Sequence, residues 1–252
     1  MATTAGEPKL RIRIVPIVLT ILLGLGLPIL AGLMALGAAR ILPFLPRGVQ
    51  PQLPWLYSQH AFQLLLALVA IAVIKRRVPA DYGLHRPRGK TYVPEAILWG
   101  IAFGIIMTLV DYAPQILARV APSLDYPLTM NNVVGWMSFE FIYVGPTEEI
   151  PFRALLVTFL AATMPGKIQF GRYRMNAAGV IVALIFALAH ISSFWLQPLW
   201  LAIGQQFYAF ALGVLYAYWL EKSQSVLAPI IGHNLSDGVE YALLYGMVAI
   251  WH

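Results

Sequence analysis

Apolar stretches about as long as a lipid bilayer is thick recur along this chain from one end to the other. A helix that crosses the hydrocarbon core, which is roughly 30 Å thick, needs about 20 mostly apolar residues. The chain is 60% hydrophobic and 11% charged, whereas an average soluble domain has about 25% charged residues. This pattern predicts an all-α protein, a polytopic bundle of transmembrane helices.

Seven segments are long and apolar enough to span a membrane, and an eighth segment, shorter or re-entrant, is the alternative. The predicted spans are Ile14–Ala39, Leu53–Ile74, Val93–Leu117, Asn132–Thr163, Asn176–Phe194, Leu196–Leu220 and Val226–Trp251. The linkers between these spans are short. We therefore expect one integral membrane domain over residues 1–252, without additional soluble domains.

Lysine and arginine are distributed unequally between the linkers, which predicts the orientation of the chain. The basic residues of one side are Lys9, Arg11, Arg13, Lys75, Arg76, Arg77, Arg86, Arg88, Lys90, Lys167, Arg172, Arg174 and Lys222, and those of the other side are Arg40, Arg47 and Arg119. Basic residues are enriched on the cytoplasmic side of membrane proteins, so the N-terminus is predicted to be cytoplasmic. The net charge of +6 is explained by these linkers, and nucleic acid is not an expected partner. The absence of cysteine excludes disulfides and thiolate metal sites.

Three charged residues lie together inside the fourth apolar segment, although a charge at the centre of a spanning helix costs about 2.5–3.5 kcal/mol on insertion scales. Glu149 and Arg153 are four residues apart, so they share a helix face in the order that favours an ion pair. Glu148 lies about 100° around the helix from Glu149, which makes it a candidate general base. The alternative is an ion-pair cluster with a purely structural role, which only holds helices together. The preceding Gly145-Pro146 predicts a kink or an opened turn.

Two later segments each carry a histidine with a partner four residues away. Phe186 and His190 lie in the fifth segment, and His233 and Asp237 lie in the seventh. A lone intramembrane histidine such as His190 is more often an interhelical hydrogen-bonding residue than a catalyst. The pair of His233 and Asp237 is equally explained by a hydrogen bond on the helix surface near the membrane edge. Counted at about 1.5 Å per residue from the helix ends, however, Glu148 and both histidines reach overlapping depths. This overlap favours one shared polar cavity.

These three patterns, in their order along the chain, resemble the three motifs of the CPBP family. They are Glu148-Glu149-x-x-x-Arg153, Phe186-x-x-x-His190 and His233-x-x-x-Asp237. That family comprises type II CAAX prenyl proteases and the Abi proteins of bacteriocin processing or immunity. The resemblance implies a catalytic core at residues 133–238. The eukaryotic prenyl proteases have Asn at the position of Asp237, which is a departure in this chain.

The resemblance implies an intramembrane endopeptidase that hydrolyses a peptide bond in a membrane-associated substrate, including a prenylated CAAX-type one. Glu148 would be the general base that activates a water together with His190. His233 and Asp237 would stabilise the oxyanion of the transition state.

The supporting residues implied by the resemblance are Glu149, Arg153 and Phe186. No metal is expected, and if zinc were bound its ligands would be Glu148, His190 and His233. The expected partners are the lipid bilayer and a membrane-anchored peptide or protein, and the expected location is a prokaryotic plasma membrane.

Two other functions remain open, a non-catalytic immunity or scaffold protein that binds peptides in the same cavity and a proton-coupled transporter. The chain shows no internal repeat of the kind that many transporters have. Asp111, Glu140 and Glu240 are intramembrane acids without a motif partner, either lining the cavity or making structural hydrogen bonds. His60 is predicted to lie at the membrane interface.

Overall fold

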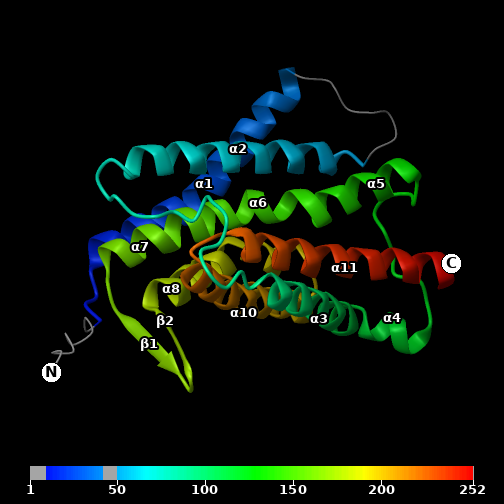
Figure 1. Cartoon of the computed structure of the whole chain (residues 1–252). Helices are drawn as coiled ribbons and strands as arrows, with labels where there is room; N and C mark the ends of the chain where they lie inside the picture. The colour runs from blue at the N-terminus through cyan, green and yellow to red at the C-terminus, as the bar shows by residue number, and fades with distance from the viewer. Residues whose placement is uncertain (1–9, 42–49, 252) are drawn as a thin grey trace, which may run out of the picture.

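The computed structural model describes residues 10–41 and 50–251, and these residues form mostly helices (Figure 1). Two of the basic residues used to predict orientation, Lys9 and Arg47, lie outside the described residues. The elements in chain order are α1 (Ile14–Ile41), α2 (Gln52–Ile74), α3 (Val93–Asp111), α4 (Ala113–Ala118), α5 (Met130–Ser138), η1 (Phe139–Tyr143), α6 (Val144–Glu149), η2 (Ile150–Val157), α7 (Thr158–Thr163), β1 (Lys167–Phe170), β2 (Tyr173–Asn176), α8 (Ala177–Ala189), α9 (Ser193–Leu196), α10 (Leu199–Ser223) and α11 (Leu227–Trp251).

Five helices of the described chain are long and apolar enough to cross a membrane. They are Ile14–Ala38, Gln52–Ile74, Val93–Asp111, Ala177–Leu196 and Leu199–Ser223, and they correspond to the first, second, third, fifth and sixth predicted spans. The fourth and seventh predicted spans are helical as well. The fourth is divided by π-helical turns, and the seventh carries the polar residues of the third motif. The chain is thus an integral membrane protein, while the number of seven spans stays a prediction.

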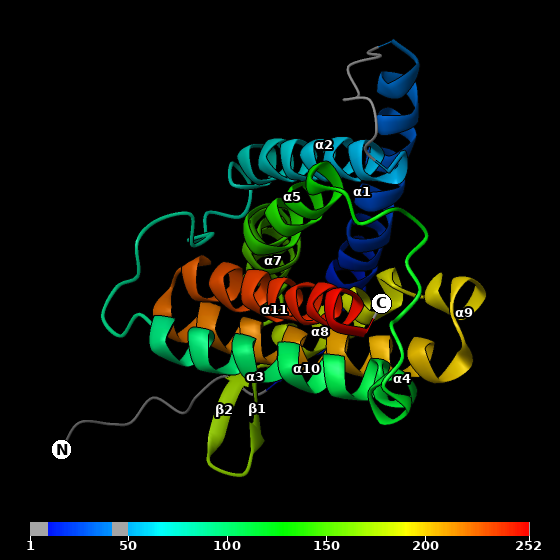
Figure 2. The ribbon, with the colours of Figure 1, turned by 90° about the vertical axis from the view of Figure 1, so that its right-hand side faces the viewer.

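The helices lie in layers that place the first motif between two neighbours. In Figures 1 and 2 the segment from α5 to α7 runs between α2 on one side and α11 on the other. Both α2 and α11 contact α6, and α3 packs on α11 along its length. Helix α1 crosses α2 and contacts α8, and α8 in turn packs against α10. The residues of α6 are therefore flanked by side chains from α2 and α11.

Two glycines of α3 allow its close packing on α11. A Cβ atom at Gly100 would lie 2.8 Å from the carbonyl oxygen of Gly232, and one at Gly104 would lie 2.7 Å from that of Ser236. Such distances are shorter than van der Waals contact, so only glycine permits this approach. Small residues spaced by four are a common device for packing helices in membranes. The close packing fixes the position of α11, on which the third motif lies.

The third predicted span ends earlier than expected. It was predicted to continue to Leu117, but α3 ends at Asp111 and a separate short helix, α4, follows. Pro114 lies in the first turn of α4, and proline cannot donate a hydrogen bond to the carbonyl four residues earlier. The long helix is therefore interrupted at this point.

A short β-hairpin, which was not predicted, joins α7 to α8. Strands β1 and β2 pair antiparallel, with Lys167 opposite Asn176 and Phe170 opposite Tyr173. The two-residue turn begins with Gly171 at φ +57°, a conformation that glycine adopts easily. The hairpin projects from the helices in Figures 1 and 2. The prediction of purely helical structure therefore fails for this linker, whose strands are too short to give a clear periodic signal.

The linkers that carry most of the basic residues meet at one end of the molecule. The side chain of Lys222 donates to the carbonyl oxygen of Arg174 (2.9 Å), and the backbone N–H of Arg88 donates to that of Ser223 (3.0 Å). We call this region, residues 75–92, 164–176 and 221–226, the basic end. Its existence agrees with the grouping of linkers that was used to predict orientation.

Candidate active site

Two prolines open the helical segment that carries the first motif. Pro146 and Pro151 have no N–H group, so neither can donate to the carbonyl of the residue four positions earlier. The chain takes π-helical turns on both sides of α6, in η1 and η2, and such turns are frequent at functional sites. The opened turn predicted at Gly145-Pro146 is therefore present as widened helical turns, without a break in the helix.

Amide side chains from the two flanking helices bind the carbonyls that the prolines leave free. Asn234 of α11 donates from Nδ2 to the carbonyl oxygen of Ile142 (3.3 Å) and accepts at Oδ1 from the N–H of Gly145 (2.7 Å). Gln63 of α2 donates from Nε2 to the carbonyl oxygen of Thr147 (3.1 Å). Unpaired backbone groups are costly in a bilayer. These amides therefore stabilise the opened turns and hold α2 and α11 against α6.

Gly145 is required for the contact between α6 and α11. A Cβ atom at this position would lie 2.7 Å from the carbonyl oxygen of Ile230 and would also overlap the side chain of Asn234. A larger residue would push α11 away from the helix that carries Glu148.

Glu149 is fully buried and has two partners. Its Oε2 lies 3.1 Å from Nε of Arg153, so the predicted ion pair is present. Its Oε1 lies 2.6 Å from Nδ1 of His233, and because an ionised carboxylate can only accept, Nδ1 donates this hydrogen bond. The guanidinium of Arg153 also lies 4.2 Å over the ring of Phe186, a cation–π contact. The Glu149–Arg153 pair thus joins the first motif to residues of the other two motifs.

His233 lies between three carboxylates. With Nδ1 bound to Glu149, its Nε2 faces Oδ2 of Asp237 at 3.2 Å and Oε2 of Glu148 at 3.8 Å. The other oxygen of Asp237, Oδ1, accepts a hydrogen bond from Ser236 (2.9 Å), and the ring of Tyr216 stacks on the imidazole with centroids 5.8 Å apart. Both the tautomer and the ring plane of His233 are therefore fixed by the protein.

Glu148 projects away from the Glu149–Arg153 pair, as predicted, and its two oxygens face different helices. Oε2 lies 3.8 Å from Nε2 of His233 on α11, and Oε1 lies 3.9 Å from Nε2 of His60 on α2. Its side chain is 15% exposed, so this carboxylate is accessible while its neighbours are buried. Its side chain makes no direct hydrogen bond within residues 10–41 and 50–251 and is available to a small polar molecule.

His190 lies at the C-terminal end of α8 and not within it. Its Nδ1 is 2.9 Å from the carbonyl oxygen of Phe186, and since a carbonyl only accepts, Nδ1 carries the hydrogen and Nε2 is left as an acceptor. The ring of Phe186 lies 4.9 Å from that of His190 and 6.2 Å from that of His233, centroid to centroid. Phe186 therefore contacts both histidines of the motifs.

His60, which was predicted to lie at the membrane interface, is buried within the protein beside the first motif. Its side chain is 8% exposed, with Nδ1 2.8 Å from Oγ1 of Thr147 and Nε2 facing Glu148. Electrostatic interactions also link His60 with His190 and His233. Its contact with Glu148 was not predicted because His60 follows polar residues near the start of its span. The useful signal was the helical spacing of Gln59, His60 and Gln63, which puts three polar side chains close together on a mostly apolar helix.

The three acids without a motif partner have different surroundings. Asp111 accepts a hydrogen bond from the hydroxyl of Tyr208 (3.3 Å), which favours the structural interpretation. Glu140 is 6% exposed and lies near enough to Asp237 and Glu240 to interact with them electrostatically. Glu140 of η1 and Glu240 of α11 therefore add two carboxyl groups to the surroundings of Asp237.

The residues of the site do not form a geometry that suits zinc. Zinc in proteins takes three or four ligands at about 2.0–2.3 Å. Within the described part of the chain, no group of three His, Asp or Glu side chains is arranged to hold a metal ion. The zinc ligands considered from the sequence, Glu148, His190 and His233, therefore do not fit this ion.

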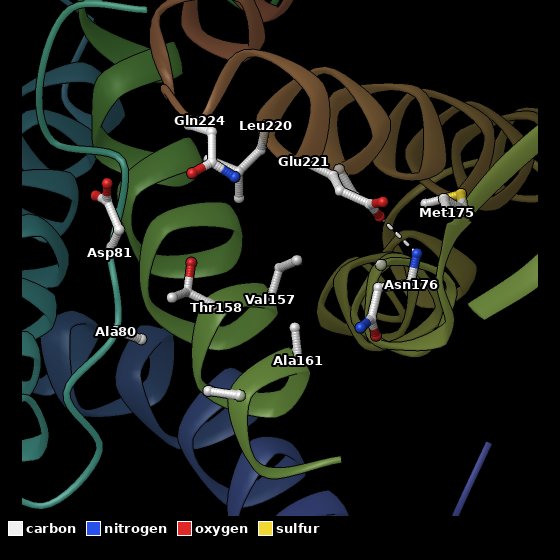
Figure 3. A pocket seen from close by; sticks show the side chains of 13 residues that line it. Ala80, Asp81, Val157, Thr158, Ala161, Met175, Asn176, Leu220, Glu221 and Gln224 are labelled. Carbon is white, nitrogen blue, oxygen red and sulfur yellow. Dashed lines mark hydrogen bonds between the residues drawn. The ribbon is translucent and has the colours of Figure 1, made fainter. Parts of the chain in front are cut away.

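A separate hollow lies at the basic end (Figure 3). Its volume is about 340 Å³, and no motif residue is among its described lining residues. Glu221 accepts a hydrogen bond from the backbone N–H of Asn176 (2.5 Å) at its rim, and Asp81 lies on the opposite side. The hollow is thus distinct from the cluster around Glu148.

Asp81 forms a small ionic cluster with two residues of the same linker. Its carboxylate lies 2.9 Å from Nε2 of His85 and 3.0 Å from Nη1 of Arg88. Partial burial raises the pKa of Asp81, but hydrogen bonds from His85 and from the N–H of Gly83 outweigh it, and the pKa is below its ordinary 3.8. Hydrogen bonds to the carbonyl of Arg86 and to Asp81 raise the pKa of His85 above 6.5.

Comparison with known families gives one match. A family model described as "Type II CAAX prenyl endopeptidase Rce1-like" matches residues 130–239, from the start of α5 into α11. The matched segment contains all three motifs, from Glu148 to Asp237, whereas α1, α2 and α3 lie outside it. Searches of curated proteins and of solved structures return no match. The predicted resemblance is confirmed, because residues 130–239 of this chain match the model of the Rce1-like type II CAAX prenyl endopeptidase family.

Proposed function

We propose that this protein is an intramembrane endopeptidase that hydrolyses a peptide bond in a membrane-anchored substrate with a prenylated, CAAX-type C-terminus. The observation that carries this proposal is the position of Glu148. Its carboxylate is partly exposed, lies within 4 Å of an imidazole on either side, and belongs to a segment that matches an endopeptidase family. A carboxylate of this kind is suited to take a proton from water.

The attack on the peptide begins with Glu148 as the general base. It takes a proton from a water molecule while the water oxygen bonds to the carbonyl carbon. His190 is the partner of Glu148 predicted from the sequence, and its Nε2, left as an acceptor by the hydrogen bond from Nδ1 to Phe186, is one candidate for the second hydrogen of this water. Glu148 then returns the proton to the leaving amine, so that one side chain serves both halves of the reaction.

Negative charge that develops on the carbonyl oxygen is stabilised by His233. Nδ1 donates to Glu149, and a contact of 3.2 Å between Nε2 and Asp237 is favourable when Nε2 also carries a hydrogen. In that state Nε2–H is a charge-assisted donor, fixed in direction before the substrate arrives. Asp237 orients this donor and needs no proton of its own. The role of Arg153 is to compensate the charge of Glu149.

The predicted catalytic core, residues 133–238, supplies these groups, and the surrounding apolar helices give access to a lipid-anchored substrate. We extend the proposal to an N-terminus in the cytoplasm and a location in a prokaryotic plasma membrane. The basic end supports this orientation, because it collects the linkers that carry most of the lysines and arginines.

The test uses the full-length protein in liposomes and a fluorogenic peptide that ends in farnesyl-cysteine followed by two aliphatic residues and a variable one. We expect the wild type to release the C-terminal tripeptide and Glu148→Gln to lower kcat by roughly 100- to 10,000-fold, the range of a general base. Glu95→Gln, which changes a glutamate paired with Lys90 outside the site, is the matched control. Cleavage by Glu148→Gln at the wild-type rate, or none by the folded wild type, contradicts the proposal.

A second measurement identifies the natural substrate. Membrane fractions from cells that produce the wild type or Glu148→Gln are compared by mass spectrometry of protein C-termini. Termini that the wild type shortens and the variant leaves intact are its products. If these shortened C-termini lack a prenylated cysteine, the endopeptidase proposal stands, but the proposal that its substrate is prenylated is contradicted.

A further inference from the structure

We propose that His60 is a catalytic residue, which holds the attacking water together with Glu148. This inference rests on the proposed endopeptidase function. It concerns α2, which lies outside the segment matched by the family model. It follows from the tautomer of His60, from its distance to Glu148 and from the number of hydrogens that one water molecule can donate.

The hydrogen bonds of Thr147 fix the tautomer of His60. The Thr147 hydroxyl donates its single hydrogen to backbone carbonyls one turn earlier, at 2.8 Å from Tyr143 and 2.9 Å from Val144. Its oxygen can then only accept from Nδ1 of His60, at 2.8 Å. Nδ1 therefore carries the hydrogen, and Nε2 presents a lone pair toward Glu148.

The gap between His60 and Glu148 suits a shared water. Nε2 and Oε1 are 3.9 Å apart, too far for a direct hydrogen bond. Two acceptors that face each other at this distance repel unless a donor lies between them. A water molecule supplies both hydrogens, one to each acceptor, and such bridges are nearly as favourable as direct bonds.

His190 is the competing acceptor for the second hydrogen of this water. Within residues 10–41 and 50–251, no nitrogen of His190 lies within 4.0 Å of a Glu148 oxygen, whereas His60 meets this limit. The distances therefore assign the second hydrogen to His60 and leave Nε2 of His190 to the substrate.

The step balances with the groups named. The water donates one hydrogen to Oε1 of Glu148 and the other to Nε2 of His60. As the water oxygen bonds to the carbonyl carbon, the O–H bond toward Glu148 breaks and the carbonyl electron pair moves to the oxygen that faces His233. When the C–N bond breaks, the amine takes the proton from Glu148. The second hydrogen stays on the new carboxyl group, which remains hydrogen-bonded to His60 until the product leaves.

Two substitutions separate this role from a structural one. In His60→Asn the amide N–H takes the place of Nδ1 and keeps the bond to Thr147, but the acceptor near Glu148 is lost. In His60→Gln the amide oxygen reaches the place of Nε2, but the bond to Thr147 is lost. Both are assayed with the full-length protein in liposomes and the farnesylated peptide, and kcat and KM are measured separately.

We expect His60→Asn to lower kcat roughly 10- to 100-fold and to leave KM unchanged. The largest loss in this range equals the smallest loss that is typical for groups that transfer a proton. His60→Gln should retain a kcat several-fold higher than that of His60→Asn. The control is Ser58→Ala on the same helix, because the Ser58 hydroxyl donates a hydrogen bond to the carbonyl of Pro54, outside the site.

The reverse order, with His60→Asn close to the wild type and His60→Gln impaired, means that His60 only supports Thr147 and overturns the inference. Equal and full activity of both variants overturns it as well. Glu148→Gln, assayed in parallel, separates the two proposals. If it is inactive while both His60 variants are unaffected, the endopeptidase function stands and the role of His60 does not.

Discussion

Helices α2 and α11 flank the same helical segment and serve it in parallel ways. Each gives an amide side chain to a carbonyl freed by a proline, Gln63 from α2 and Asn234 from α11. Each also places an imidazole nitrogen within 4 Å of one oxygen of Glu148, from His60 and His233 respectively. The difference is charge. Helix α11 adds the carboxylate of Asp237, and its His233 binds Glu149, whereas α2 contributes one neutral amide and one imidazole to these contacts.

This difference indicates a division of roles. The α11 side holds a network of buried charges, which is stable only while every charge is compensated. The α2 side holds hydrogen-bonding groups that fix tautomers and carbonyls. Loss of a charge on the α11 side should therefore destabilise the protein more than loss of an amide on either side.

The largest effect is expected for Arg153→Met. This change keeps an unbranched apolar side chain against Phe186 but leaves the buried carboxylate of Glu149 without its cation. Breaking one partner of a buried ion pair costs about 3–5 kcal/mol. Thermal unfolding in detergent should show the loss, with Arg119→Met, in the linker after α4, as the control. A variant as stable as the wild type would mean that the charge network does not hold the α11 side.

A smaller effect is expected when each amide is removed, and this pair compares the two sides directly. Asn234→Leu leaves two backbone groups of α6 and η1 unpaired, whereas Gln63→Leu leaves one. Each buried unpaired group costs about 1–3 kcal/mol. Asn234→Leu should therefore lower the unfolding temperature more than Gln63→Leu does. A larger loss for Gln63→Leu would show that α2, and not α11, is the main support of the opened turns.

The smallest effect is expected outside the membrane, at Asp81. Because the pKa of Asp81 is lowered in the folded protein, Asp81 stabilises the fold above about pH 3.8. This stabilisation is lost as the pH falls through the pKa of Asp81 in the folded protein. Because the pKa of His85 is raised in the folded protein, His85 stabilises the fold below pH 6.5. This stabilisation is lost as the pH rises through the pKa of His85 in the folded protein. Asp81→Asn should thus reduce stability most between pH 3.8 and 6.5, as unfolding at several pH values would show. A difference that is constant with pH contradicts this account.

The sequence predicts the charged part of the site better than its neutral part. Glu149 and Arg153 are recognisable as a pair because ion pairs on a helix require a fixed spacing. His233 and Asp237 follow the same spacing, and acids or histidines in apolar segments are unusual enough to attract attention. His60 has no such partner on its own helix. Its role depends on Thr147 and Glu148, which are 87 and 88 positions away in the sequence, and only the packing of α2 on α6 reveals it.

The same limit applies to the fold. Span positions follow from apolar length, and five of them agree with the structure. The opened turns were indicated by Gly145-Pro146, but the amides of Asn234 and Gln63 that complete them are long-range contacts. The hairpin between α7 and α8 was missed because its four-residue strands are too short for alternation to stand out.

The most direct test of the central claim, that Glu148 activates water for peptide hydrolysis, is cleavage of the farnesylated peptide in water enriched in ¹⁸O. Mass spectrometry of the new C-terminus reads the result. The account predicts one ¹⁸O atom in the new carboxyl group for each bond cut by the wild type, and almost no labelled product with Glu148→Gln. Labelled product formed equally fast by Glu148→Gln, or no cleavage by the folded wild type, would contradict it.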